Sequence, residues 1–373
     1  MADQMESTLP QLRAENLPPA PQDAQNAASA RMRRSNLPRY RDRGSNNDRY
    51  RAMESSMFSY ARAVRLVTTL AALSVTQAFA ANHVPLTAIG AEPIVEDDFI
   101  YARAGGGELR AHSYRPKTPG LRAAIIDVHG GAWSSGDRMQ GAHYDRALAS
   151  SGLFVLAIDF RQAPAAQHPA ANRDIAAAIR YLRANATQLS IDPASIGLVG
   201  SSSGGHLAML AGLGPNSEPY RGTEISSGSG FVLANDADAS VRYVIALWPV
   251  SDPAYRYEYA KRVGRGELLK SHDAYFGSFE AMQRASVPRL LRAKEATQLP
   301  PLFVVQPGND ANIPREMTFD LISAYQEAGG RVAYQFYPNR AHAFGHRASA
   351  ETDHLVAAMR DFIAAQLAVP VDR

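Results

Sequence analysis

Short apolar segments alternate with longer segments of helical character from Glu96 onward, and this alternation limits the possible folds more than any other feature of the sequence. Strands separated by helices are joined by crossover connections, which produce a mainly parallel sheet with helices on its faces. Strands are expected at 123–128, 154–160, 196–199, 241–247, 302–305 and 332–337, after a hairpin of 99–101 and 109–114. Helices are expected at 141–151, 172–186, 204–211, 315–327 and 350–367. The pattern predicts an α/β fold with a mainly parallel central sheet flanked by helices.

Two segments, 215–240 and 253–298, do not follow the alternation. Open α/β sheets bind their ligands beyond the carboxyl ends of the strands. We therefore expect both segments to be cap insertions above the sheet, where they shape a binding site.

Residues 57–80 have the three parts of a secretory signal peptide. Arg62 and Arg65 supply the positive charge, an apolar run follows, and Ala78-Phe79-Ala80 forms a small-residue cleavage site. The apolar run is shorter than the roughly 20 residues that a membrane-spanning helix needs, so no stable membrane insertion is expected after cleavage. We expect cleavage after Ala80 and a secreted or periplasmic protein. A buried amphipathic helix is the alternative interpretation.

A signal peptide stands at the N-terminus of a protein, but 56 residues precede this one. Residues 1–56 are rich in Pro, Asn, Ser, Gln and Arg and have neither helical nor strand periodicity. We expect a disordered or non-native extension, with translation beginning near Met53 or Met57. The domain that acts is then 81–373.

The absence of cysteine excludes disulfides, cysteine-ligated metals and a thiol nucleophile. The net charge of +3 comes from the first 80 residues, which hold 11 Lys and Arg against 7 Asp and Glu. Residues 81–373 hold 28 basic and 29 acidic residues, with no basic cluster interleaved with aromatic residues. Nucleic-acid binding is therefore not expected.

A segment of glycine and serine lies between an expected strand and an expected helix. Residues 200–204 read Gly-Ser-Ser-Ser-Gly and follow the apolar run 196–199. A Gly-x-Ser-x-Gly sequence in this context forms a sharp turn that exposes the central serine above the sheet. Only Ser202 has a glycine both two residues before and two residues after it, so Ser202 is the candidate nucleophile. A flexible linker is the alternative, which the flanking strand and helix disfavour.

Residues 127–133 read Asp-Val-His-Gly-Gly-Ala-Trp and directly follow the expected strand 123–128. Backbone N–H groups stabilise an oxyanion only where the chain closely approaches the substrate, and adjacent glycines permit this. We expect the N–H groups of Gly130, Gly131 and Ser203 to form an oxyanion hole.

An acid and a base complete a serine triad and follow the serine in the order Asp, His. Asp310 follows the expected strand 302–305, and His342 follows the expected strand 332–337. Both therefore lie at the same edge of the sheet as Ser202. We expect Asp310 to orient His342 and stabilise its imidazolium, while His342 takes the proton of Ser202.

Each of these assignments has an alternative. Asp252, after the expected strand 241–247, is another candidate acid, and Asp310 could instead cap a helix. His346 and His354 are other candidate bases, although His354 lies within an expected helix and His346 is further from a strand end.

Trp133 and Trp248 lie just after strand ends and are expected either to contact the substrate or to belong to the core. His342 and His346 have the spacing of metal ligands on a helix, but the intervening Phe-Gly indicates a loop. No metal site is expected there.

Several of these motifs together resemble the α/β-hydrolase esterases of the hormone-sensitive-lipase and acetyl-esterase type. They are His-Gly-Gly-Ala-Trp-Ser-Ser-Gly-Asp at 129–137, Asp-Phe-Arg-Gln-Ala-Pro at 159–164, and the serine turn with Asp310 and His342. The resemblance extends over about 96–367.

The resemblance implies an α/β-hydrolase fold and hydrolysis of carboxylic esters of small to medium acyl groups, through an acyl-enzyme on Ser202 and without a cofactor. The family often has Asp or Glu at the position of Ser201 and Ala at that of Ser203, so the subfamily and substrate stay open. The alternatives are an amidase, aryl formamidase or peptidase with the same triad, or a non-catalytic binding protein. The expected partner is a small-molecule ester.

Overall fold

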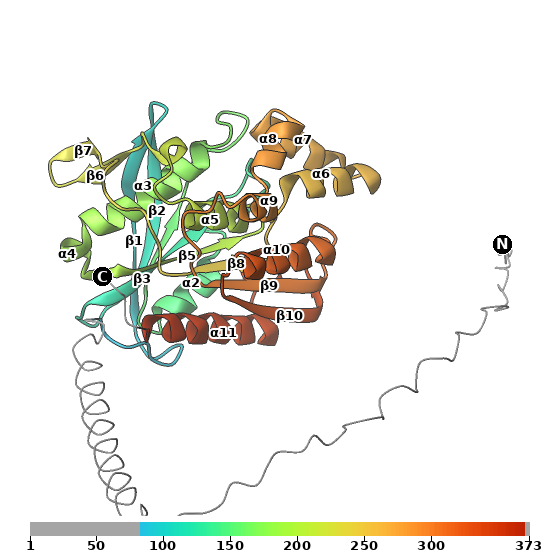
Figure 1. The fold of residues 1–373 in the computed structure, drawn as a ribbon. Coiled ribbons are helices and arrows are strands. Elements are labelled where there is room, and N and C mark those ends of the chain that lie inside the picture. The colour runs from blue at the N-terminus through green and yellow to red at the C-terminus, as the bar shows by residue number, and fades with distance from the viewer. Residues whose placement is uncertain (1–82, 370–373) are drawn as a thin grey trace, which may run out of the picture. The chain divides into compact units, whose positions relative to one another are not determined.

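A ten-stranded sheet forms the centre of the computed structural model, which describes residues 83–369 (Figure 1). The expected extension 1–56 and signal peptide 57–80 lie outside the described residues. In chain order the strands are β1 (Ile94–Ala104), β2 (Gly107–Pro116), β3 (Arg122–Val128), β4 (Phe154–Ile158), β5 (Ile191–Ser201), β6 (Glu224–Ser227), β7 (Gly230–Leu233), β8 (Val244–Leu247), β9 (Leu302–Asn309) and β10 (Val332–Ala341). Their order across the sheet is β10-β9-β8-β5-β3-β4-β2-β1-β6-β7.

The sheet is parallel from β4 to β10, and β1 and β2 form an antiparallel hairpin that joins it through β4. Every residue of β3, β4 and β8 is buried, as is typical of parallel strands covered on both faces. The predicted α/β fold with a mainly parallel sheet is confirmed.

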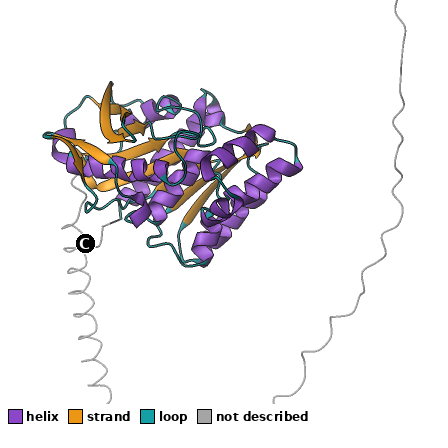
Figure 2. Ribbon diagram, turned by 90° about the horizontal axis from the view of Figure 1, so that it is seen from above, coloured by secondary structure: helices purple, strands orange, loops and turns teal. Residues whose placement is uncertain are grey.

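Helices cover both faces of this sheet, which Figure 2 shows with helices in purple and strands in orange. The principal ones are α2 (Ala142–Ala149), α3 (Ala170–Ala184), α5 (Ser203–Leu213), α10 (Arg315–Glu327) and α11 (Ala350–Leu367), with the short α4 (Ala186–Leu189) after α3. Side chains alternate along β3: Ala124 and Ile126 pack with α3, α5 and α10, whereas Ile125 packs with α2 and α11. No helix within 83–369 is both long and apolar enough to cross a membrane.

The segment 215–240 does not lie above the sheet, so that expectation is wrong. After a short 3-10 helix η1 (Glu218–Tyr220), it forms the hairpin β6–β7, and β6 pairs antiparallel with β1. Ile225 of β6 is buried in the core. The hairpin thus extends the sheet beyond β1 at Ala102 and Arg103, whose backbone would otherwise lie at the edge of the sheet.

The segment 253–298 forms four helices at the upper right of Figure 1. They are α6 (Pro253–Arg262), α7 (Gly266–Phe276), α8 (Phe279–Arg284) and α9 (Val287–Arg292). His206 Nε2, in the first turn of α5, donates to the carbonyl oxygen of Ala285 at 2.8 Å, and Val287 N donates to that of Ser251 at 2.9 Å. These contacts place the helical insertion at the carboxyl ends of the strands.

Candidate active site

Ser202 stands in a sharp turn between β5 and α5. Its φ of 54° lies in the left-handed region, which is unfavourable for a serine. A Cβ atom on Gly200 would collide with the carbonyl oxygen of Gly204, and one on Gly204 would collide with that of Val128. The two glycines are therefore sterically required, and they hold Ser202 above the carboxyl end of the sheet, where it is 8% exposed.

The structure brings Ser202, His342 and Asp310 together in one hydrogen-bonded chain. His342 Nε2 lies 3.0 Å from Ser202 Oγ, and His342 Nδ1 lies 2.7 Å from Asp310 Oδ2. Because a carboxylate only accepts, Nδ1 carries the proton and Nε2 accepts from the serine hydroxyl. This tautomer is the one in which the imidazole can act as a base toward Ser202.

Asp310 is held rigidly in the loop after β9. Its Oδ1 accepts from the backbone N–H groups of Asn312 at 2.8 Å and Ile313 at 3.0 Å, and its side chain is fully buried. Asp252, the alternative acid, instead caps α6 by accepting from Tyr255 N at 2.9 Å.

The alternative bases His346 and His354 do not contact Ser202. Burial lowers the pKa of His346 to about 4, and its ring packs against Trp248. His354 Nδ1 lies 3.0 Å from the hydroxyl of Tyr337, away from the triad.

The expected oxyanion hole is wrong at Gly130. Its backbone N–H donates to Gln140 Oε1 at 2.6 Å, so this donor is already engaged. The N–H groups of Gly131 and Ser203 have no acceptor among the described residues. A glycine permits close approach of the chain, but the local backbone conformation decides where its N–H points, and residue type alone does not reveal that.

Ala132 provides a third N–H with no acceptor within 83–369, which the sequence did not suggest. Gly131, Ala132 and Trp133 have φ values of 107°, 52° and 61°, so the loop turns through three consecutive left-handed residues. Trp133 N donates to Ser203 Oγ at 3.2 Å, which ties this loop to the serine turn. The position of Ala132, directly after the glycine pair, could have suggested a role for its N–H. Alanine, however, rarely adopts a positive φ, so its residue type did not indicate this conformation.

Trp133 and Trp248 are fully buried and belong to the core. Trp133 stacks on Tyr275 of α7 with ring centroids 5.5 Å apart, and Trp248 packs against Phe344 at 5.2 Å. Of the two expectations, the structure therefore supports the core and not a substrate contact, because neither indole is exposed.

Beneath the turn, two buried carboxyl groups form a feature that the sequence analysis did not find. The hydroxyl of Tyr144 donates to Asp127 Oδ1 at 3.0 Å, and burial raises the pKa of Asp127 to about 7. Burial and the nearby Asp127 likewise raise the pKa of Asp145. Within 83–369, no group of three or more His, Asp or Glu side chains has the arrangement of a metal site.

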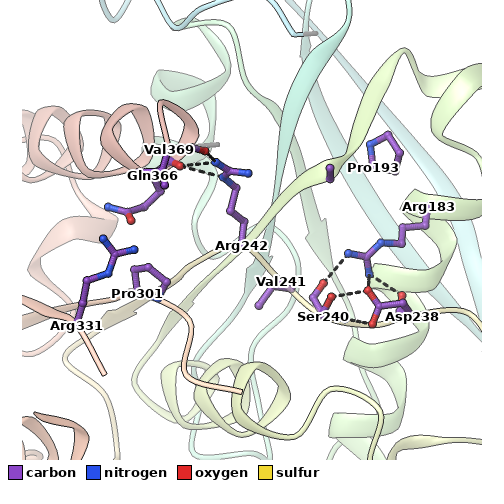
Figure 3. A pocket seen from close by; sticks show the side chains of 11 residues that line it. Arg183, Pro193, Asp238, Ser240, Val241, Arg242, Pro301, Arg331, Gln366 and Val369 are labelled. Atoms are coloured by element: carbon purple, nitrogen blue, oxygen red, sulfur yellow. Dashed lines mark hydrogen bonds and ion pairs between the residues drawn. The ribbon is translucent and has the colours of Figure 1, made fainter. Parts of the chain in front are cut away.

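A cavity of about 650 Å³ is separate from these residues (Figure 3). Its lining includes Pro193 near the start of β5, Val241 before β8 and Pro301 before β9, which are the amino ends of the strands. Arg242, also in its wall, donates to the carbonyl oxygen of Gln366. Since Ser202 lies at the carboxyl ends, this cavity is not part of the candidate active site.

Comparison with known proteins gives several related sequences. The chain is 29% identical to Esterase LipC of Mycobacterium tuberculosis over 230 residues, which cover 59% of this chain and 52% of LipC. It is 27% identical to Esterase LipQ of the same organism over 270 residues, which cover 71% of this chain and 61% of LipQ. The chain thus spans little more than half the length of these relatives.

Solved structures share the fold. The hyperthermophilic esterase from the archaeon Pyrobaculum calidifontis is similar with a TM-score of 0.60 and 22% identity, over 75% of this chain and 86% of that one. Thermogutta terrifontis esterase 2, phosphorylated by paraoxon, has a TM-score of 0.57 and 20% identity, over 72% of this chain and 94% of that one.

A family model described as BD-FAE matches residues 113–325, which is more than half of the chain. The matched region includes the glycine loop, the serine turn and Asp310. The chain therefore belongs to the BD-FAE family, and it is an α/β-hydrolase of the hormone-sensitive-lipase type.

Proposed function

We propose that the chain is a serine hydrolase that cleaves carboxylic esters of small to medium acyl groups. The observation that carries this proposal is the 3.0 Å contact between Ser202 Oγ and His342 Nε2. The backbone N–H groups of the glycine loop and the serine turn that have no acceptor in the described part of the chain support it. The relatives named esterase support the same chemistry.

In the first step, Ser202 Oγ attacks the ester carbonyl carbon and its proton passes to His342 Nε2. The carbonyl oxygen becomes an oxyanion, which accepts from the N–H groups of Gly131, Ala132 and Ser203. The bond to the alcohol oxygen then breaks, and His342 returns its proton to the departing alcohol.

In the second step, water attacks the acyl-enzyme. His342 takes a proton from the water, the bond between the acyl group and Ser202 breaks, and the proton returns to Ser202 Oγ. Asp310 stabilises the imidazolium that forms in each step, because its carboxylate lies 2.7 Å from Nδ1. The carboxylic acid leaves, and the free enzyme is restored.

The test is hydrolysis of p-nitrophenyl esters of increasing acyl length by the wild type, Ser202→Ala and Ser201→Ala. We expect turnover of the shorter esters, its loss in Ser202→Ala, and its retention in Ser201→Ala, the matched neighbouring serine. A wild type that cleaves an aryl formamide or dipeptide amide but no ester would overturn the proposal. So would full ester turnover in Ser202→Ala.

We also propose that the protein is exported and cleaved after Ala80. The composition of 57–80 supports this proposal, and these residues lie outside the described part of the chain. N-terminal sequencing of the protein from the periplasm or culture medium tests it. A start at Ala81 is expected, and a protein retained in the cytosol with the segment intact would contradict it.

A further inference from the structure

The cavity at the amino ends of the strands combines apolar surface with positive charge (Figure 3). Its volume of about 650 Å³ is within the range of roughly 300–1,000 Å³ that small-molecule sites occupy. Its polar lining includes three arginines and one carboxylate. The apolar part of the wall consists of Pro193, Ala194, Val241, Pro301 and Val369.

The carboxylate in this wall is already paired with one of the arginines. Arg183 Nη1 lies 3.4 Å from Asp238 Oδ2, and Arg183 Nη2 donates to the carbonyl oxygen of Ser240 at 2.8 Å. Figure 3 shows this group on one side of the cavity, away from the other two arginines. Asp238 therefore balances the charge of Arg183, and the wall keeps two cations without an acidic partner among residues 83–369.

The first of these cations is Arg242, whose hydrogen bonds go to carbonyl oxygens. Its Nη2 donates to that of Gln366 at 2.7 Å and also to that of Val369. Burial lowers the pKa of the guanidinium, because the charged form has lost part of its hydration. Its Nη1 has no acceptor within the described part of the chain. An anion in the cavity would accept from Nη1 and offset the lost hydration.

The second cation is Arg331, directly before β10. Its backbone carbonyl oxygen accepts from Leu302 N at 2.9 Å, which fixes the residue at the amino ends of β9 and β10. Its side chain forms neither a hydrogen bond nor an ion pair with any residue that the structure describes. In Figure 3 the guanidinium points toward the side chain of Gln366, on the side of the cavity that is away from Arg183. All of its N–H donors are therefore available to a ligand.

We propose that this cavity binds a monocarboxylate with a short apolar chain. The carboxylate accepts from Arg331 and Arg242, and the chain contacts Val241 and Pro301. Arginine suits this ligand because its planar guanidinium matches the two oxygens of a carboxylate. The apolar wall favours such a molecule over a small inorganic anion, which would leave that wall in contact with water. Because Ser202 lies at the opposite ends of the strands, the proposal does not depend on ester hydrolysis.

The first experiment is isothermal titration calorimetry with hexanoate, hexanamide and acetate. Hexanamide has the chain without the charge, and acetate has the charge without the chain. We expect hexanoate to bind, and the other two to bind at least about tenfold more weakly, because each lacks one of the two interactions. The proposal is overturned if hexanamide or acetate binds as tightly as hexanoate. It is also overturned if hexanoate does not bind at concentrations up to about 20 mM.

The second experiment locates the site with variants. Arg331 is exposed, so Arg331→Gln should fold normally, and the Kd for hexanoate should rise at least about tenfold. Arg289 of α9 is also exposed but is not part of the wall, so Arg289→Gln is the matched control and should stay within about twofold of the wild type. An unchanged Kd in Arg331→Gln overturns the proposal.

A third variant distinguishes a free carboxylate from one that the chain itself supplies. Asp372 comes three positions after Val369 and lies outside the described residues. We expect Asp372→Asn to bind hexanoate with a Kd within about twofold of the wild type. Binding at least about tenfold tighter in Asp372→Asn would mean that Asp372 competes for the cavity, which overturns the proposal of a free ligand.

These experiments also separate the proposal from the proposed ester hydrolysis, of which hexanoate is a product. A protein that binds hexanoate through Arg331 but hydrolyses no ester contradicts the proposed function and supports this site. A protein that hydrolyses esters but binds hexanoate equally well in Arg331→Gln supports the function and contradicts the site.

Discussion

His342 Nδ1 lies 2.7 Å from Asp310 Oδ2, and the other oxygen of Asp310 accepts two backbone hydrogen bonds from its own loop. The acid is thus held by the chain on one side and holds the imidazole on the other. Such a carboxylate selects one tautomer of the histidine, the one that leaves Nε2 free to accept from the serine.

Asp310→Asn should lower kcat/KM for a short p-nitrophenyl ester by about 10³–10⁴-fold, because an amide no longer stabilises the imidazolium and favours the wrong tautomer. Asp252→Asn should leave kcat/KM within about twofold and cost at most about 1 kcal/mol of unfolding free energy, since it changes only a helix cap. Steady-state kinetics and thermal melts of both variants check this. Equal losses of activity in the two variants would contradict the assignment of the acid.

Ala132→Gly should keep full activity, whereas Ala132→Val should lower kcat by at least about tenfold. Glycine adopts the observed φ of 52° without strain and keeps the N–H, but a β-branched side chain disfavours that φ and displaces the loop. The kcat values of the two variants, with circular dichroism to establish folding, test this. Equal activity of the valine variant would show that a β-branched side chain at this position does not displace the loop.

Trp133→Phe should destabilise the protein by about 1–3 kcal/mol while leaving KM for short esters within about twofold. The indole is fully buried against Tyr275, so its loss removes packing and no substrate contact. Urea denaturation and steady-state kinetics measure the two effects. A raised KM without loss of stability would instead indicate that the indole touches the substrate.

Asp127→Asn should stabilise the protein at pH 8 and have little effect near pH 4. The pKa of Asp127 is raised to about 7 by burial, so the folded state keeps a proton that the unfolded chain releases above about pH 4. Between about pH 4 and pH 7, the unfolding free energy of the wild type therefore falls by about 1.4 kcal/mol per pH unit. The unfolding free energy of Asp127→Asn does not fall in this way, because the amide does not titrate.

Urea denaturation at pH 4, 6 and 8 provides the measurement, with the exposed Asp236→Asn as the control. The difference between wild type and Asp127→Asn should grow with pH, and Asp236→Asn should follow the wild type. A constant difference at all three values would mean that Asp127 is already ionised in the folded protein.

The serine turn could be predicted because its requirements are local. Gly200 and Gly204 are needed by steric contacts within the turn and with the neighbouring strand end, and the apolar run before them identifies the strand. Asp310 and His342 could also be predicted, because each comes directly after an apolar strand segment and parallel strands end at the same edge of a sheet. A pattern within about ten residues therefore located each of the three side chains.

The hairpin β6–β7 could not be predicted, because it pairs with β1, a strand more than 100 residues earlier in the chain. The occupied N–H of Gly130 and the free N–H of Ala132 depend on how the glycine loop folds against Gln140 and Ser203. The burial of Trp133 depends on α7, which comes from the helical insertion.

Residue type and spacing were sufficient to predict the nucleophile, the order of the triad residues and the parallel sheet. These features follow from backbone sterics and strand direction over short stretches of chain. The direction of each N–H, the burial of Trp133 and the protonation of Asp127 were settled by contacts between segments distant in sequence. Hydrogen-bond geometry and the energy of a buried charge change over a few ångströms, and that scale is set only when the segments pack together.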